Sequence, residues 1–383
     1  MFILLTAFFC LLNTQNSYAI PSFSRQTNMA CNACHTVFPR LTTFGRIFKL
    51  NGYNVTGNST IESQDKNGKT MLKILTLSPI SVMFQTSYTH LNTKQPGTQN
   101  DNIEFPQQLS LFYGGGIAPH LGMFIQMTYE AQSGTIGLDN TDLRYANNTT
   151  LFGKGLVYGF TLNNNPTVQD VWNSTPAWGF PFAGPDVAPT PQEATMIEGG
   201  LSQAVAGVGA YALFNNLVYG EFSIYRSAQL AVPAPPDSTS SGIIKGVSPY
   251  WRLSFQKNWS KHYLEIGTFG LNTQLYPAGV SGLTNGFLDL GFDLQYEYAM
   301  NIGNIVLHSS FINEKRSLKA TFDAGDSANE KVNLNSFKVD GTVYFQKGFA
   351  ATIGYFTVSG DQDEGLYTPE PVSGNRTGVP NSN

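Results

Sequence analysis

The stretch LDLGFDLQYEY, residues 288–298, places an apolar or aromatic side chain at every second position and a polar residue or glycine between them. A strict period of two is the pattern of a β-strand with one apolar and one polar face. The same alternation recurs at residues 121–130 and 337–346. We therefore predict a mainly β protein that forms roughly thirteen antiparallel strands from about Leu75 onward.

Composition indicates what surrounds the apolar face of these strands. Charged residues make up 13% of the 383 residues, against about 25% in soluble domains, and aromatic residues also reach 13%. After residue 19 there is no apolar run of about 18 residues, which excludes transmembrane helices. The net charge of −4 argues against nucleic-acid binding. These features predict that residues 75–383 form a porin-like outer-membrane β-barrel in contact with the lipid of a Gram-negative bacterium.

The connections between the predicted strands alternate in length. Short turns are expected near residues 118–122, 214–216, 258–261, 300–304 and 346–348. Long polar loops are expected near residues 92–102, 164–195, 228–247, 275–286, 316–334 and 360–380. Outer-membrane barrels have short periplasmic turns and long extracellular loops, so the long loops should face outward. The loop at 164–195 is long enough to fold over the barrel mouth or into it.

The C-terminus leaves two interpretations open. Bacterial single-chain barrels have an even number of strands, whereas the count of roughly thirteen is odd. The chain ends in the polar residues Pro380 to Asn383 without a recognisable final strand. Either a few C-terminal strands are missing from this sequence, or the count is wrong and the last segment is a periplasmic tail.

The N-terminus predicts export. Residues 2–12 are almost wholly apolar, and Ser17 and Ala19 supply small side chains at the positions that a signal peptidase reads. We predict that residues 1–19 are a signal peptide cleaved after Ala19. An N-terminal membrane anchor is the alternative, but the apolar run is short for a membrane span. Cleavage leaves Cys31 and Cys34 as the two cysteines of the mature chain.

These two cysteines lie in the sequence MACNACH at residues 29–35. The pattern C-x-x-C-H is typical of c-type haem attachment, in which two thiols bind the porphyrin covalently and the histidine ligates the iron. We therefore predict that Cys31 and Cys34 bind one haem c and that His35 is its proximal ligand. A redox dithiol would need a βαβ context, which the sequence pattern here lacks. A zinc site would need further Cys or His ligands nearby, and residues 36–70 contain none.

Residues 20–53 form a short haem-binding segment in this prediction. Thr42 or Thr43 should cap a helix that ends at Asn51-Gly52. The apolar residues of this helix are Phe44, Ile47, Phe48 and Leu50. They either cover a face of the haem or pack on protein, as in an ordinary amphipathic helix. So short a segment cannot enclose a haem unaided, and the barrel must therefore complete the pocket. Residues 54–74 are predicted to be a polar linker.

The N-terminal segment resembles one known family. The matching residues are Pro21 to Thr27, Cys31 to His35, Phe38-Pro39, Leu41-Thr42, Gly45-Arg46, Phe48-Lys49 and Gly52-Tyr53. This pattern is similar to that of the fused outer-membrane cytochrome–porins, Fe(II) oxidases of iron-oxidising bacteria in which a monohaem cytochrome c is joined to a barrel. The resemblance implies about sixteen strands when the barrel is complete, of which the C-terminal ones would be missing here. It also implies the haem roles of Cys31, Cys34 and His35, and Fe(II) as the substrate.

The sequence does not identify the distal haem ligand. Met29 is too close to Cys31 to reach the opposite face easily. Met71 and His120 are the first candidates, and His120 should face the lumen at the periplasmic start of its strand. Of the remaining histidines, His308 is expected to face the lumen. His90 should lie at the lipid face or girdle, and His262 in a turn.

The resulting hypothesis is an outer-membrane electron-transfer protein. Extracellular Fe(II) would reduce the haem, which would pass the electron to a periplasmic cytochrome. The predicted lumenal acids Asp289, Asp293 and Glu297 could attract Fe(II), since oxygen ligands suit it, but an ordinary polar barrel wall would carry the same residues. Two alternatives stay open: a cytochrome–porin for a different extracellular donor, and a passive porin with a structural haem.

Overall fold

The computed structural model describes residues 21–36, 38–54, 60–68, 70–75, 78–92, 97, 99–130, 134–177, 193–228, 234–345, 349–367 and 378–380. The predicted signal peptide, residues 1–19, lies outside this part of the chain. No helix in the described ranges is both long enough and apolar enough to cross a membrane.

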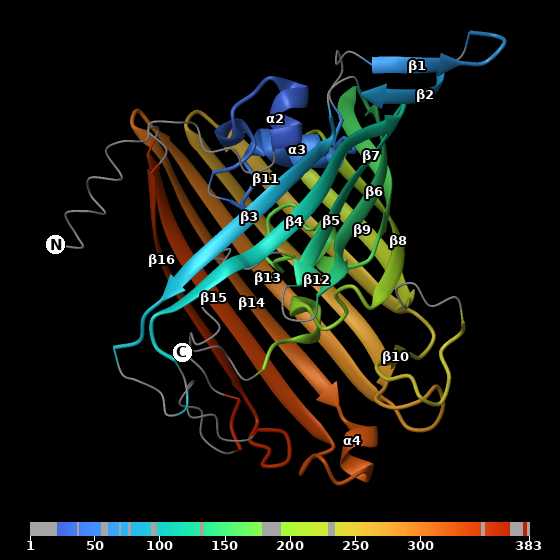
Figure 1. The fold of residues 1–383 in the computed structure, drawn as a ribbon, viewed down its shortest axis with the longest axis vertical. Helices are drawn as coiled ribbons and strands as arrows, with labels where there is room; N and C mark the ends of the chain where they lie inside the picture. Colours follow the sequence, from blue (N-terminus) through green and yellow to red (C-terminus); the bar gives the residue numbers. More distant parts are fainter. Residues whose placement is uncertain are drawn as a thin grey trace.

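One antiparallel sheet of 14 strands makes up most of the molecule (Figure 1). Its spatial order follows the sequence from β3 to β16, except that the short strand β10 pairs with β12 beside this path. The strands are β3 (Ile80–Thr89), β4 (Asn102–Ala118), β5 (Leu121–Glu130), β6 (Thr135–Leu151), β7 (Lys154–Asn163), β8 (Val205–Phe214), β9 (Val218–Ser227), β10 (Ile243–Ile244), β11 (Ser248–Trp259), β12 (His262–Tyr276), β13 (Asn285–Met300), β14 (Gly303–Ser317), β15 (Lys331–Phe345) and β16 (Phe349–Gly360).

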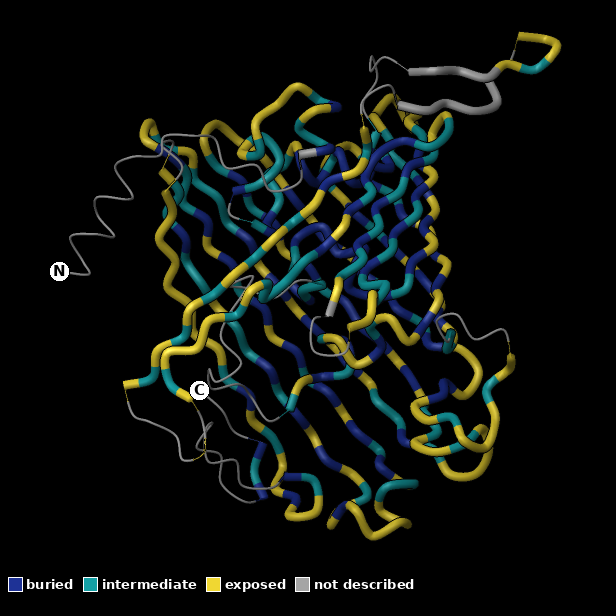
Figure 2. The backbone as a smooth tube through the Cα atoms, in the orientation of Figure 1, coloured by how far each residue is buried: buried dark blue, intermediate teal, exposed yellow. Residues whose placement is uncertain are grey.

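The sheet rolls up into a barrel shape but does not close (Figures 1 and 2). Within the described ranges, β3 pairs with β4 and β16 pairs with β15, and the two edge strands do not pair with each other. Strong right-handed twist is what lets an antiparallel sheet of this width curl. The predicted antiparallel sheet is confirmed, whereas the expected closed barrel is not.

The alternation of the strands sets which residues face inward. On β13, Leu288 and Phe292 are 49% and 52% exposed and face outward. Asp289 and Asp293 are 2% and 5% exposed and face the interior. Figure 2 shows the same alternation of buried and exposed residues along the other strands. The predicted apolar-out, polar-in pattern is therefore confirmed.

The two ends of the rolled sheet differ. Tight turns join β4 to β5, β8 to β9, β11 to β12 and β13 to β14 at one end, which we call the short-turn end. The longer connections, including β10 and the helix α4 (Lys319–Asp323), lie at the opposite, long-loop end (Figure 1). At the short-turn end, the ring of His262 stacks on Trp259 at 5.4 Å and its Nδ1 lies 2.7 Å from the hydroxyl of Tyr296. Aromatic residues clustered at a strand end are typical of an interfacial girdle.

The N-terminal segment precedes the sheet and lies at the short-turn end (Figure 1). It contains α2 (Pro21–Thr27), the 3-10 turn η1 (Cys31–Ala33) and α3 (Thr43–Leu50). The predicted linker at 54–74 holds a hairpin of β1 (Thr60–Gln64) and β2 (Thr70–Leu75), so the expectation of a plain linker is wrong. The hairpin projects beyond the rolled sheet in Figure 1.

The interior of the rolled sheet is filled by segments that fold inward. The connection after β7 enters the lumen with η2 (Pro166–Gln169), and its Trp172 is 2% exposed. Further along the same connection, Ile197 of η3 (Met196–Glu198) and Leu201 pack with Tyr250 and Phe269 of the wall. Of the two expected courses of this loop, over the barrel mouth or into it, the described residues 164–177 and 193–204 follow the second.

Candidate functional site

The Cys31–His35 sequence forms one tight helical turn. The backbone N–H groups of Cys34 and His35 both donate to the carbonyl of Cys31, at 3.1 and 2.9 Å. Cys31 and Cys34 therefore lie one helical turn apart. Their spacing of one turn directs the two thiols toward the same region, which is the arrangement that attachment to two vinyl groups of one porphyrin requires.

Helix α3 supports this turn directly. The hydroxyl of Thr42 accepts from the N–H of Gly45 at 3.1 Å and donates to the carbonyl of Ala33 at 2.6 Å. A Cβ atom at Gly45 would lie 2.2 Å from the carbonyl oxygen of Cys34, so only glycine allows the helix to pack this closely. Of the two predicted cap positions, Thr42 and Thr43, the cap is Thr42, and the predicted helix end at Asn51 is confirmed.

The helix buries more of its circumference than the sequence suggests. Phe48 and Leu50 are buried as expected, but so are Arg46 and Lys49. Phe44 is 38% exposed, so its predicted place on the buried face is wrong. The reason is that a carboxylate of the barrel wall pairs with Arg46 and backbone carbonyls of the inward loop accept from Lys49, which allows a charged face to be buried.

A mostly apolar cavity lies beside the turn. The cavity is partly open to solvent. The side chains of Cys31, Cys34 and His35 all line it. The other contributions come from the N-terminal segment, the barrel wall and the inward loop, and include Phe23, Phe48, Tyr53, Phe112, Phe124 and Val171.

His35 is held as a neutral imidazole. Burial lowers its pKa to about 4, although the neighbouring backbone carbonyls of Arg40 and Pro39 act in the opposite direction. Neutral imidazole is the form that ligates iron. The residues around His35 therefore fit a proximal ligand.

The alternatives for the two cysteines fit less well. Burial, together with the nearby Cys31, raises the pKa of the Cys34 thiol to about 11, whereas redox-active cysteines have lowered pKa values. Across the ranges that the structure describes, no group of three or more Cys, His, Asp or Glu residues is arranged to hold a metal ion. Neither a redox dithiol nor a zinc site is supported by this geometry.

Ion pairs attach the N-terminal segment to the barrel wall. The guanidinium of Arg46 donates to Glu297 of β13 at 2.9 Å and lies 4.1 Å from the ring centroid of Tyr263 on β12. The guanidinium of Arg40 forms a two-pronged pair with Asp340 of β15. Both arginines are at most 4% exposed, so these pairs are shielded from solvent.

Hydrogen bonds to the opposite side of the wall complete the attachment. The hydroxyl of Tyr53 donates to Asp142 of β6 at 2.5 Å, and Asp142 also accepts from Arg144 at 2.6 Å. The hydroxyl of Tyr211 on β8 donates to the carbonyl of Leu50 at 2.7 Å. Because contacts reach β6, β8, β13 and β15, the segment is wedged across the lumen.

Lys49 is a cavity-lining cation that the sequence did not single out. Its ammonium donates to the backbone carbonyls of Val168 and Asp170, with the second contact at 3.3 Å. Burial and the charge of Arg144 lower its pKa to about 8. Only the three-dimensional fold brings the inward loop beside α3, so no local pattern could have indicated this contact.

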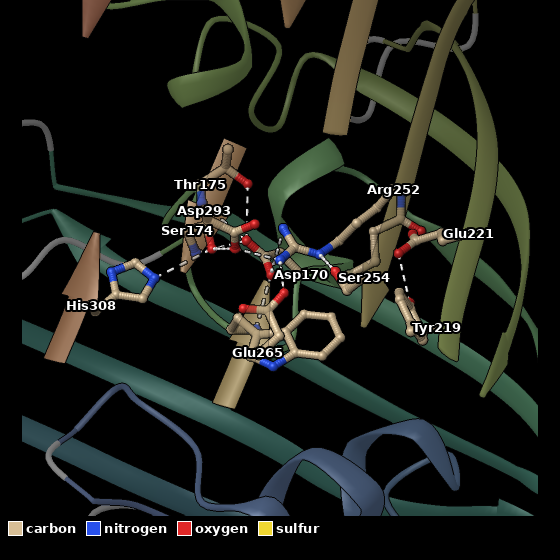
Figure 3. Close-up of polar contacts among 12 residues, drawn as sticks. Asp170, Ser174, Thr175, Tyr219, Glu221, Arg252, Ser254, Glu265, Asp293 and His308 are labelled. Carbon is tan, nitrogen blue, oxygen red and sulfur yellow. Dashed lines mark hydrogen bonds and ion pairs between the residues drawn. The ribbon is translucent and has the colours of Figure 1, made fainter. Parts of the chain in front are cut away.

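The inward loop is tied to the wall by a buried charged network (Figure 3). Arg252 of β11 pairs with Asp170, Glu265 and Asp293, at 3.5 and 3.1 Å for the first two. The hydroxyl of Ser174 donates to Asp293 and lies 3.3 Å from Nε2 of His308. The predicted lumenal position of His308 is therefore confirmed.

The three acidic residues predicted to attract Fe(II) are largely engaged by other groups of the protein. Asp289, Asp293 and Glu297 do face the lumen, as predicted. However, Asp293 pairs with Arg252 and Glu297 pairs with Arg46. Asp289 accepts from the backbone N–H of Ile197 at 2.6 Å. Since two of the three charges are already compensated, the pairing argues against a free acidic path for Fe(II).

The candidates for a distal ligand have different outcomes. His120 lies in the β4–β5 turn with φ +62°, is exposed, and sits beside the ring of Tyr145, so its predicted lumenal position is wrong. The turn interrupts the alternation on which that prediction depended. Met71 lies on β2, and its side chain is outside the described residues. Met29 lines the cavity and is 39% exposed. His90 is exposed beside Asp101, in keeping with its expected place outside the lumen.

Comparisons with known proteins do not assign a family. No protein-family model matches the chain, and no curated protein matches it. Among solved structures, the chain is similar to OmpTdeltaL8, a loop L8 deletion mutant of OmpT, an outer membrane protein of Vibrio cholerae. The identity is 9%, the match covers 74% of this chain and 95% of that chain, and the TM-score is 0.34. A likeness of this degree carries no argument about function, so the site has to be interpreted from its own geometry.

Proposed function

We propose that this protein is an outer-membrane cytochrome–porin that accepts electrons from extracellular Fe(II) through one covalent haem c and passes them to a periplasmic cytochrome. One observation carries the proposal. The three residues of the C-x-x-C-H sequence line the same apolar cavity, and the barrel wall completes that cavity with Phe112 and Phe124. The Fe(II) donor itself follows from the resemblance of the N-terminal segment to the cytochrome–porins.

Each residue of the site has a definite role in this proposal. Cys31 and Cys34 would hold the porphyrin through thioether bonds, and neutral His35 would ligate the iron. When bound, the haem supplies one-electron redox chemistry. The aromatic side chains of Phe23, Phe48 and the wall exclude water from the site, and a less polar environment is one of the ways a protein tunes a haem potential.

The filled lumen favours electron transfer over passive diffusion. A barrel of this width would otherwise leave an aqueous channel. In the described residues the N-terminal segment spans the lumen between Glu297 and Asp142, and the inward loop adds Trp172, whose indole N–H donates to Tyr263 at 2.7 Å. A passive porin with a structural haem is therefore the weaker of the alternatives. A different extracellular donor would use the same site.

An outer-membrane location accords with the outer surface of the sheet. Large apolar side chains such as Leu290, Phe292 and Phe311 face outward and are 41–52% exposed. Apolar surface of this extent on a rolled antiparallel sheet is suited to contact with lipid chains. The short-turn end would then face the periplasm and bring the haem segment close to its electron acceptor.

The direct test is stopped-flow mixing of the purified, oxidised protein with Fe(II) under anaerobic conditions. We expect the reduced-haem absorbance bands to appear, and the Cys31→Ala, Cys34→Ala variant to lack them. If dithionite reduces the haem but Fe(II) does not, the donor is a different one. If the wild-type protein has no haem absorbance, the proposal fails entirely.

A further inference from the structure

A polar groove lies on the outer wall near the long-loop end, away from the haem cavity. Its residues come from four adjacent strands, β12 to β15. The strand registers place them in two rows that run across the sheet. One row is Asn272, Leu288, Lys315 and Asn333, and the other is Gln274, Gly286, Ser317 and Lys331.

The groove is positively charged. Lys315 and Lys331 are both exposed, and neither forms an ion pair within the described ranges. Lys315 pairs with Asn333 and Lys331 with Ser317, so the two lysines are diagonal neighbours on one face, about 7–8 Å apart at the backbone. Long lysine side chains can bring both ammonium groups to one anion over that distance.

The other charges at the groove are already bound. Arg316 points to the lumen, where it pairs with Glu314 and with Glu193 at 2.9 Å. The carboxylate of Asp361, which lies beside the groove, accepts from the backbone N–H and the side-chain amide of Asn333 at 2.7 and 2.8 Å. The two lysines thus outnumber the one carboxylate beside the groove, and the net charge of this surface is positive.

The position of the groove limits what it can bind. Leu288 lines it, and Leu290 and Phe292 continue the exposed apolar surface of β13 toward the short-turn end. A ligand that occupies the groove would thus have an anionic part next to the lysines and an apolar part along the leucines. Membrane proteins place lysines at this boundary, where the acyl chains end and the headgroups begin.

We propose that this groove binds the phosphorylated headgroup of an acylated glycolipid in the outer leaflet. The proposal rests on the outward orientation of the long loops under the proposed function. The phosphate accepts hydrogen bonds from Lys315 and Lys331, the amides of Asn272 and Gln274 contact the sugar hydroxyls, and the acyl chains lie against Leu288. A free phosphate would use the lysines but leave the adjacent apolar surface without a partner.

The test uses the full-length protein in detergent and lipid A, with binding measured by native mass spectrometry in the presence of EDTA. EDTA removes divalent cations that could bridge the lipid phosphate to the protein, so the assay measures the direct contact between the phosphate and the lysines. One lysine near a charged lipid surface contributes about fivefold to binding, so Lys315→Gln with Lys331→Gln should weaken binding by about 30-fold. Lys315→Arg with Lys331→Arg should retain it, because the charge remains.

Lys257 provides the matched control. It is an exposed, outward-facing lysine near the short-turn end of β11, at the other rim of the wall. Lys257→Gln should leave lipid A binding unchanged. Equal binding by wild type and the double glutamine variant would overturn the proposal, as would an equal loss in Lys257→Gln. Displacement of lipid A by an equal concentration of inorganic phosphate would also overturn it. Haem content, measured on the same samples, reports separately on the proposed function.

Discussion

The docking of the N-terminal segment in the lumen can be tested by removing Glu297. In the structure, Arg46 bonds not only to Glu297 but also to the carbonyl of Leu41 at 2.7 Å and to the hydroxyl of Thr43 at 3.0 Å. The last two partners belong to the N-terminal segment itself. Glu297→Ala therefore removes a contact between the segment and the wall without changing the segment's own sequence.

The size of the effect follows from burial. Breaking a buried ion pair by removing one partner costs about 3–5 kcal/mol. The side chain of Glu297 keeps 15% exposure and Arg46 keeps its other partners, which lowers the expected cost to about 2–3 kcal/mol. Because about 1.36 kcal/mol corresponds to a factor of ten, the undocked population should rise by about 30- to 150-fold.

Limited trypsin digestion measures this population. Arg40, Arg46 and Lys49 are 2–7% exposed while the segment is docked, so cleavage after them requires undocking. When docking is faster than cleavage, the cleavage rate follows the undocked population. The rate should therefore rise by the same factor, about 30- to 150-fold, in Glu297→Ala.

Two further variants make the test specific. Glu314→Ala breaks a buried pair with Arg316 on the neighbouring strand and should not increase cleavage within the segment. Arg46→Met with Glu297→Met replaces the pair by apolar side chains and should be less destabilising than Glu297→Ala alone. Cleavage of Glu297→Ala at the wild-type rate, or an equal increase in Glu314→Ala, would refute the reasoning.

Three other predictions follow from the same structure. A tag inserted near Ser238, in the connection between β9 and β11, should be labelled on intact cells, and labelling only after permeabilisation would reverse the orientation. Urea titrations should show that the free energy of unfolding rises by about 1.5 kcal/mol from pH 8 to 9.5. The pKa of Lys49 is about 8 in the folded protein and 10.5 in its reference state, so the unfolded chain binds more protons over this range. The rise should be absent in Lys49→Met. His120→Ala should leave the visible spectrum of the haem unchanged, since the side chain lies outside the lumen; a changed spectrum would contradict its placement.

The sequence predicted the features that depend on local patterns. Alternation identified which residues of β13 face the lumen. The end of α3 at Asn51 was predicted, and its cap was narrowed to Thr42 or Thr43, of which the structure has Thr42. Where a local rule stopped applying, the prediction failed. His120 follows a positive-φ turn rather than strand parity, and the residues between 60 and 75 form a hairpin.

The contacts that build the site could not be predicted in this way. Arg40 meets Asp340 across 300 positions of sequence, and Arg46 meets Glu297 across 251. These pairings depend on strand register and on the entry of α3 into the lumen. A charged residue on a short helix is normally expected to face water. Only the fold supplies the opposing carboxylates that allow Arg46 to be buried.

The central claim is that Cys31 and Cys34 hold a haem covalently. Its most direct test is the intact mass of the purified, denatured protein from a host that matures c-type cytochromes, compared with that of the Cys31→Ala, Cys34→Ala variant. We predict that the wild-type mass exceeds the chain mass by one haem and that the variant shows no such excess. A wild-type mass equal to that of the chain alone, in the same host, would contradict the account.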